Sequence, residues 1–239
     1  MVMRVIAFKL WGDFAHFRRH FTTSSPLTHC LPPPSALRGL VGAIIGLAPS
    51  AYPEELSPEN CRLGVRLLKP LKKIRLSLNY LDTKDGAWVT KPPKGRLHTQ
   101  VRVEFLKDPS FEVFFYHKDR SLMDEFSKRL KHHRTVYTPF LGISECLASF
   151  EFLWDEEVRP LKGKVKMISA FPTRDLEDLK LGQGVKLLRE VIPSFIDAER
   201  RRCLSEEVTF SPYAEPIEAV VREAFGYPQK REEAFSFIG

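Results

Sequence analysis

The chain has 239 residues, of which 43% are hydrophobic and 28% are charged, so it can bury a core as one large domain or two small ones. Its formal net charge of +7 favours a polyanionic partner, although a basic enzyme surface gives the same balance. The longest apolar run, Leu40 to Ala48, is far too short to span a membrane, so we expect no membrane association.

The N-terminus and the cysteines predict a cytoplasmic protein without cofactors. Val2 to Leu10 is too short for a signal peptide and carries Arg4 and Lys9. The four cysteines stand far apart without a CxxC pair, which fits neither a zinc site nor a disulfide scaffold. No acidic cluster suits a metal nuclease, and no Walker-type ATP loop is present, so we expect no metal and no other cofactor. Scarce Asn and Gln beside many charged residues favour a thermophilic source.

The first elements are a strand, a long loop and a helix. Val2 to Leu10 alternates and is rich in β formers, and Gly12 to Pro34 is predicted to be loop. Ser35 is expected to cap a helix that runs to about Leu47, because prolines precede it and Pro49 follows. Three glycines weaken this helix and fall near one face: Gly39, Gly42 and Gly46. They predict that this face lies close to another backbone, which we expect to be a sheet.

Further strands and a second helix follow. "DRSLMDEFSKRLKHHR" is a predicted helix with apolar residues at a spacing of four and a Glu125–Arg129 pair. Cys61 to Asp82 predicts one long strand or two, and "KDPS" predicts the turn of a hairpin between flanking strands. The strand candidates around these elements are Leu97 to Phe105, Phe111 to His117, Thr135 to Phe140 and Cys146 to Trp154.

The order β-α-β-β-α-β predicts an α+β fold with a ferredoxin-like domain over residues 1–155. "DEEVRPLKGK" is a candidate boundary, and residues 156–239 are expected to form a smaller, loop-rich, β-containing second domain. That part holds two short strand candidates and a weakly helical stretch near Leu176 to Ile192. The RNP-like aromatic pattern of a generic RNA-recognition domain is missing.

The segment from Gly12 to Leu47 combines aromatic, basic and hydroxyl side chains. Arginines there can bind phosphates, hydroxyls can donate hydrogen bonds to phosphates or 2′-OH groups, and aromatic rings can stack on bases. The helix N-terminus at Ser35 offers free N–H groups to a phosphate, and Arg38 one turn later could reinforce it. The alternative is structural: the phenylalanines pin the loop to the core and the arginines are simply solvated.

Four stretches occur in an order and spacing that resemble one family: "LWGDFAHFRR", "TTSSPLTHCLPPPSALRGLVGAIIGL", "FLKDPSFEVFF" and "YTPFLGISECLASF". They resemble the CRISPR-associated Cas-five family, the subunit that caps the 5′ end of the guide RNA in type I Cascade complexes. The resemblance covers roughly Met1 to Phe152 and is nearest to members from subtypes I-A and I-B. The C-terminal third matches no motif residue by residue.

The resemblance implies a modified RNA-recognition-like domain of the repeat-associated type, with a β-hairpin thumb. Its partners would be the crRNA through its 5′ handle, the Cas-seven backbone subunit, the large subunit and, within the complex, target DNA. "GISE" would bring backbone N–H groups to a phosphate. The RNA-contact candidates are Trp11, His16, Arg18, Arg19, His20, Thr22, Thr23, Ser24, Ser35, Arg38, Gly142 and Ser144.

The thumb candidate is the stretch of about residues 81–98, which is too long and polar for a tight turn. Its candidate contacts with RNA or a partner are Trp88, Lys91, Lys94 and Arg96. A tryptophan at a basic hairpin tip suits a gap between bases or a partner's pocket, while the alternative is that it folds back on its own hairpin.

We expect a non-catalytic RNA-binding subunit, and two other functions stay open. A metal-independent endoribonuclease that processes precursor crRNA, as in subtype I-C, needs a base, an acid and a cation near the phosphate. His117 beside Lys118 is the first pair to test for it. A general RNA-binding protein would need no sister subunits.

Overall fold

The computed structural model describes residues 2–22, 25–81, 98–179 and 186–239. Its first sheet has the order β3-β6-β1-β7, and every neighbouring pair is antiparallel. The strands are β1 (Met3–Trp11), β3 (Cys61–Leu67), β6 (Ser110–His117) and β7 (Ser149–Val158). With helices α1 (Pro34–Ile45) and α3 (Arg120–Lys131), they give the predicted order β-α-β-β-α-β.

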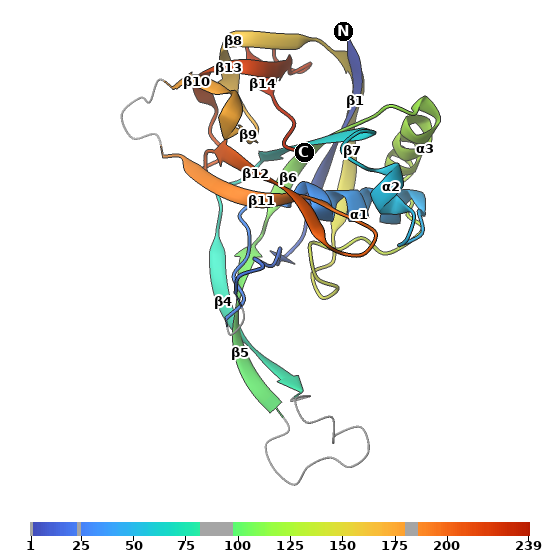
Figure 1. The fold of residues 1–239 in the computed structure, drawn as a ribbon, viewed down its shortest axis with the longest axis vertical. Helices are drawn as coiled ribbons and strands as arrows, with labels where there is room; N and C mark the ends of the chain where they lie inside the picture. Colours follow the sequence, from blue (N-terminus) through green and yellow to red (C-terminus); the bar gives the residue numbers. More distant parts are fainter. Residues whose placement is uncertain (1, 23–24, 82–97, 180–185) are drawn as a thin grey trace.

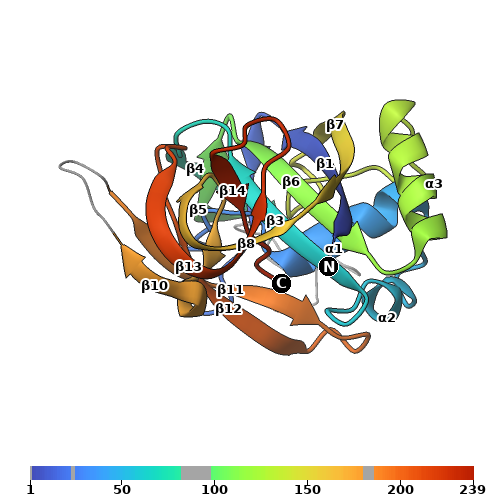
Figure 2. The same ribbon diagram turned by 90° about the horizontal axis from the view of Figure 1, so that it is seen from above.

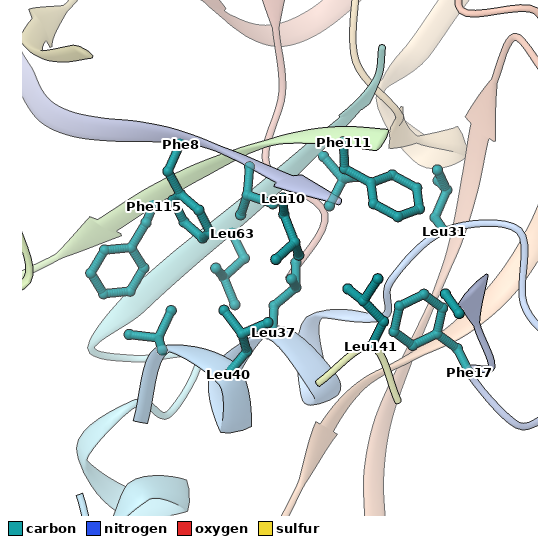
Figure 3. Packing of buried hydrophobic residues seen from close by; sticks show 14 of the residues in the cluster. Phe8, Leu10, Phe17, Leu31, Leu37, Leu40, Leu63, Phe111, Phe115 and Leu141 are labelled. Carbon is teal, nitrogen blue, oxygen red and sulfur yellow. The ribbon is translucent and has the colours of Figure 1, made fainter. Parts of the chain in front are cut away.

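Both faces of the first sheet are covered, which explains why β6 is buried along nearly its whole length. Phe115 points to the helical side, where its ring lies 4.9 Å from that of Phe126 on α3. Its neighbour Phe114 points the opposite way and stacks at 4.1 Å on Phe235 near the C-terminus. Figure 3 shows the helical side, where Leu37 and Leu40 of α1 face the sheet.

The start of α1 corrects one prediction. The N-cap is Pro33, no side chain caps the helix, and Ser35 lies inside the first turn rather than at the cap. Prolines fix φ near the helical value and need no N–H partner at this position, so they begin the helix without a hydroxyl. Asp119, by contrast, caps α3 by accepting a 2.8 Å hydrogen bond from the Ser121 N–H, and Glu125 pairs with Arg129 as predicted.

The glycine face of α1 does not meet a sheet, so that prediction is wrong. Gly39 and Gly42 lie against the Tyr52 side chain at the start of the short helix α2 (Tyr52–Glu55). Gly46 ends α1 with a left-handed φ of 90° and lies against Val136. Gly42 therefore makes room for the neighbouring Tyr52 side chain, and Gly46 closes the helix.

A hairpin of β4 (Lys73–Leu81) and β5 (His98–Lys107) leaves the body of the molecule (Figure 1). It forms a second sheet with β2 (Phe14–Ala15), in the order β2-β5-β4. The predicted hairpin around "KDPS" is wrong, because β5 pairs with β4 and β2 while β6 enters the first sheet. The reason is burial: β6 is buried on both faces, whereas β5 exposes its polar positions.

The predicted strand over residues 135–140 is absent from the structure. This stretch is loop and makes one isolated bridge, between Phe140 and Leu147, before β7 begins at Ser149. Gly142 turns the chain with a φ of 94°. Gly142 lies inside the six-residue loop that this bridge closes. The loop is too short, and its backbone turns too sharply at the glycine, for regular strand pairing.

The C-terminal part is richer in strands than predicted. The expected helical stretch near residues 176–192 is wrong, because the described residues there form strands with alternating burial, as in Glu190 and Ile192. The elements are β8 (Pro160–Met167), β9 (Phe171–Pro172), the 3-10 turn η2 (Thr173–Asp175), β10 (Leu176–Leu179), β11 (Leu188–Ile196), β12 (Arg202–Phe210), β13 (Ile217–Gly226) and β14 (Glu233–Phe235). They form sheets of order β10-β13-β14-β8 and β11-β12-β9.

Of the C-terminal strands, β13 and β14 pack on the face of the first sheet that α1 and α3 leave open, whereas β11 lies against α1 (Figure 2). Leu63 of β3 exchanges backbone hydrogen bonds of 2.8 and 2.9 Å with Ile238 and Gly239. A Cβ at Gly64 would lie 2.5 Å from the Ser236 carbonyl, so only glycine permits this approach. The division of the chain at residue 155 stays a prediction, and the two parts share two hydrophobic clusters.

Candidate nucleic-acid interface

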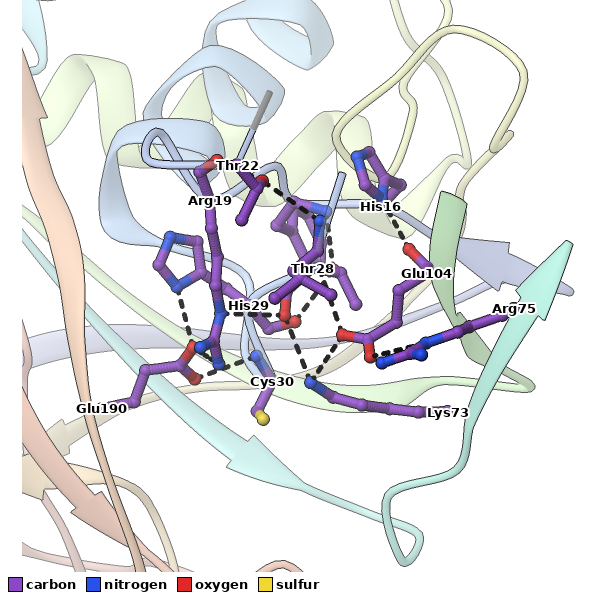
Figure 4. A network of polar contacts seen from close by, with 12 residues as sticks. His16, Arg19, Thr22, Thr28, His29, Cys30, Lys73, Arg75, Glu104 and Glu190 are labelled. Carbon is purple, nitrogen blue, oxygen red and sulfur yellow. Dashed lines mark hydrogen bonds and ion pairs between the residues drawn. The ribbon is translucent and has the colours of Figure 1, made fainter. Parts of the chain in front are cut away.

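The basic loop of residues 12–33 before α1, which we call the opening segment, is tied to the C-terminal sheet by one carboxylate, Glu190 of β11 (Figure 4). Arg19 Nη2 lies 2.5 Å and His29 Nδ1 2.9 Å from Glu190 Oε1, and the Cys30 N–H donates to Oε2 at 2.9 Å. Burial raises the pKa of Glu190, but the His29 and Cys30 hydrogen bonds and the charges of His29 and Arg19 outweigh it and lower that pKa. The segment is therefore held by an ionised, buried acid.

A second carboxylate, Glu104 of β5, ties the same segment to the base of the hairpin. Its Oε1 lies 3.0 Å from Lys73 Nζ and accepts from the Thr28 N–H at 3.3 Å. Its carbonyl lies 2.7 Å from His16 Nδ1. Burial lowers the pKa of His16, so we assign this ring as neutral and donating through Nδ1 to the carbonyl.

Two predicted RNA contacts are buried and cannot reach a ligand. His16 is 3% exposed and Arg38 is 1% exposed. Arg38 Nε donates to the Leu56 carbonyl at 2.6 Å, and its Nη1 donates to the Ser194 carbonyl of β11. Both side chains join elements that are distant in sequence, so their predicted role in RNA contact is wrong.

Other predicted residues are exposed or occupied in local bonds. Arg18 and His20 are exposed, and Arg18 Nη2 donates to the Thr22 carbonyl at 3.2 Å. Arg19 is engaged by Glu190, and Thr22 Oγ1 shapes the turn by donating to the Arg19 carbonyl at 2.9 Å. Trp11 is half-buried below the Lys9 ammonium, 4.7 Å from its ring. Thr23 and Ser24 lie outside the described residues.

The structure adds Arg202 at the start of β12, which our sequence reasoning missed. Its Nη1 lies 2.8 Å from His20 Nδ1, although the two residues are 182 positions apart. The run of arginines from 200 to 202 was the available signal. Arg18, His20 and Arg202 form the group that we call the exposed basic cluster.

A cleft of about 470 Å³ opens between α1, α2, the loop at residues 137–142 and the end of β11. Tyr52 OH accepts a 3.0 Å hydrogen bond from Arg200 Nη1, and the Arg200 guanidinium lies 5.7 Å from the Tyr52 ring. Tyr137 and Phe140, about half exposed, line it from the loop. Two predicted contacts, Ser35 and Gly142, line this cleft, whereas Ser144 is exposed and donates to Glu145 at 3.0 Å.

Gly142 has a structural role in the turn that carries the loop. A Cβ there would lie 2.1 Å from the His16 carbonyl, and its φ is in the left-handed region. The turn therefore packs backbone to backbone against the opening segment. Tyr52, Tyr137 and Arg200 were not predicted, because two tyrosines and an arginine from three separate segments give no pattern along the chain.

The hairpin of β4 and β5 has one basic polar face and one apolar face. Arg75 lies opposite Glu104 and Ser77 opposite Arg102 on the polar face. On the other face Val103 is buried, while its cross-strand partner Leu76 is 36% exposed and Tyr80, further out, is 44% exposed. The thumb candidates Trp88, Lys91, Lys94 and Arg96 lie outside the described residues.

The catalytic candidate His117 has both ring nitrogens engaged. The ring is 6% exposed, Nδ1 accepts from the Asp119 N–H at 3.0 Å, and Nε2 lies 3.0 Å from the Glu55 carbonyl. Only Lys118 of the pair is exposed. This arrangement leaves His117 no free nitrogen to take a proton from a 2′-OH.

Among the described residues, no group of three or more His, Cys, Asp or Glu side chains could hold a metal ion. No helix in that part of the chain is long and apolar enough to cross a membrane.

These features define a mostly β, α+β protein built from several antiparallel sheets, with a basic segment beside a projecting hairpin. Residues 5–200 match the model of the family described as CRISPR-associated protein (Cas_Cas5). The chain therefore belongs to the Cas5 family, as the sequence motifs predicted.

One curated relative is similar in sequence, and two solved structures are similar in fold. The chain is 32% identical over 152 residues to a Thermus thermophilus protein named "CRISPR pre-crRNA endoribonuclease Cas5d". That match spans 59% of this chain and 61% of the relative, which is less than two thirds of its length. A CRISPR protein from Archaeoglobus fulgidus has the same fold, with a TM-score of 0.55, 16% identity and 98% of both chains covered. A chain of a "CRISPR RNA-guided surveillance complex" gives 0.54, 15% identity and 95% coverage of both.

Proposed function

We propose that this protein binds the 5′ handle of the crRNA as a subunit of a type I Cascade complex, without cleaving it. The observation that carries the proposal is the exposed basic cluster, which brings Arg18 and His20 of the opening segment together with Arg202 of β12. Guanidinium groups bind phosphates through several donors at once. The anchors at Glu190 and Glu104 hold this segment in place, so the ordering cost of binding is reduced.

The first test removes two exposed cations. Arg18→Ala with Arg202→Ala is expected to weaken binding of single-stranded repeat RNA and to reduce the salt dependence of log Kd by about 0.7 per lost phosphate contact. Fluorescence anisotropy over a salt series measures both quantities. The control is Arg174→Ala with Arg222→Ala, which removes the same charge from arginines paired with Glu206 and Glu177. Equal effects in the two double variants would show that only net charge matters.

The finer parts of the proposal concern partners. We assign the hairpin of β4 and β5 as the thumb, whose apolar face with Leu76 and Tyr80 suits the Cas-seven backbone subunit. The large subunit and target DNA within the complex are the other partners. The subtype, I-A or I-B, rests on the motif resemblance alone.

The second candidate function is processing of precursor crRNA, favoured by the name of the Thermus thermophilus relative. We expect the purified protein to leave repeat RNA intact in EDTA and in magnesium, because His117 has both ring nitrogens engaged in a buried position. Gel analysis of labelled repeat RNA measures this. A single cut within the repeat that disappears in His117→Ala would replace the binding proposal with the nuclease, and Lys118→Ala would then test the cation.

A further inference from the structure

We propose that the cleft between α1, α2, the loop at residues 137–142 and the end of β11 holds one unstacked base of the bound RNA. This inference rests on the proposed function and assigns a binding site to one base of the RNA. The cleft volume of about 470 Å³ is at the low end of the range for pockets that enclose small ligands, which suits one nucleotide rather than a helix or a strand.

Most of the α1 residues that line the cleft are small. Gly39 and Gly42 line it together with Ala36 and Ala43. Glycine inside a helix is unfavourable, and packing explains it only at Gly42, where a Cβ would lie 3.1 Å from the Tyr52 Cβ. A Cβ at Gly39 would meet nothing nearer than the Tyr52 ring, at 4.0 Å, so packing does not require glycine at this position.

The walls offer the groups that bind an unpaired base. Tyr52, Tyr137 and Phe140 present aromatic rings, which stack on any base. Ser35 and Thr138 offer hydroxyls to the base edge. Among the described residues that line the cleft the one charge is that of Arg200, which uses a single donor on Tyr52 and has four others for a phosphate.

The arginine run of residues 200–202 contributes to both the cleft and the exposed basic cluster. Arg200 lines the cleft, and Arg202, two residues later, lies against His20. Two residues of extended chain span at most about 7 Å, so one strand of RNA can contact both arginines. Gly142 on the cleft wall also packs on the backbone of His16 in the opening segment.

The test fills the cleft without disturbing the helix. Gly39→Leu adds a side chain over the floor and raises helix propensity, and Gly39→Ala is the matched control because its Cβ fits in ordinary contact. The probe is single-stranded CRISPR repeat RNA with 2-aminopurine placed at one position at a time. In wild type we expect one position to change fluorescence on binding. In Gly39→Leu we expect that signal to be lost and the RNA to bind about tenfold to a hundredfold more weakly.

The outcomes separate this inference from the proposed function. If wild type does not bind the RNA, the proposed function fails. If wild type and Gly39→Leu bind equally with equal fluorescence, the cleft inference is overturned and the proposed function stands. Normal RNA binding by Gly39→Leu with lost assembly onto the backbone subunit would mark the cleft as a protein-docking site instead. Tyr137→Ala, at a half-exposed ring, is expected to give the same loss and decides the matter if Gly39→Leu does not fold.

Discussion

Arg38→Ala is expected to lower the free energy of unfolding by about 3–5 kcal/mol, the largest effect that we expect from one side chain in this protein. Arg38 is a buried guanidinium whose pKa is lowered by burial, and it donates to carbonyls of Leu56 and Ser194. Hydrogen bonds to a charged group contribute about 1.5–3 kcal/mol each, and truncation also leaves a cavity between α1 and β11.

Urea denaturation at neutral pH measures this loss. Arg38→Met keeps most of the side-chain volume and separates the hydrogen bonds from the packing, so we expect an intermediate value. Arg134→Ala, at an exposed position past the end of α3, is the control and is expected to stay within about 0.5 kcal/mol of wild type. An Arg38→Ala variant with unchanged stability and weaker RNA binding would contradict the structural role and restore the phosphate contact.

Glu190→Gln is expected to cost about 3 kcal/mol at pH 7, because it removes the negative charge that pairs with Arg19 and His29 inside the protein. The pKa of Glu190 is lowered in the folded state. Its contribution is therefore fully present above the ordinary pKa of about 4.5 and is lost as the pH falls through the folded value below it. The stability difference between wild type and Glu190→Gln should shrink in that acidic range.

Two measurements check this prediction. Urea denaturation between pH 3 and pH 7 gives the pH dependence, and hydrogen exchange reports whether residues 16–30 open more often in the variant. Glu206→Gln on neighbouring β12 is the control, because its partner Arg174 is largely exposed, and we expect a change below about 1 kcal/mol. An identical pH profile in wild type and Glu190→Gln would show that the anchor contributes nothing.

Local patterns in the sequence were enough to predict the order of the strands and helices that form the first sheet and its helical layer. The alternation in β1 and the spacing of four in α3 depend only on neighbouring residues, so the order β-α-β-β-α-β could be predicted. The "KDPS" hairpin could not be decided in the same way. A strand's partner depends on which faces become buried, and this is a property of the whole chain.

The sequence by itself determined the family, the basic character of the opening segment and the glycine-dotted helix. Tertiary structure alone decided which of those residues reach solvent. Arg38 and Arg19 have the same chemistry as Arg18, yet one is enclosed by the Leu56 and Ser194 carbonyls, one is paired with Glu190, and only Arg18 is exposed. The difference arises because β11, more than 150 residues away, folds back over α1 and the opening segment, and burying a cation requires partners that a local pattern does not reveal.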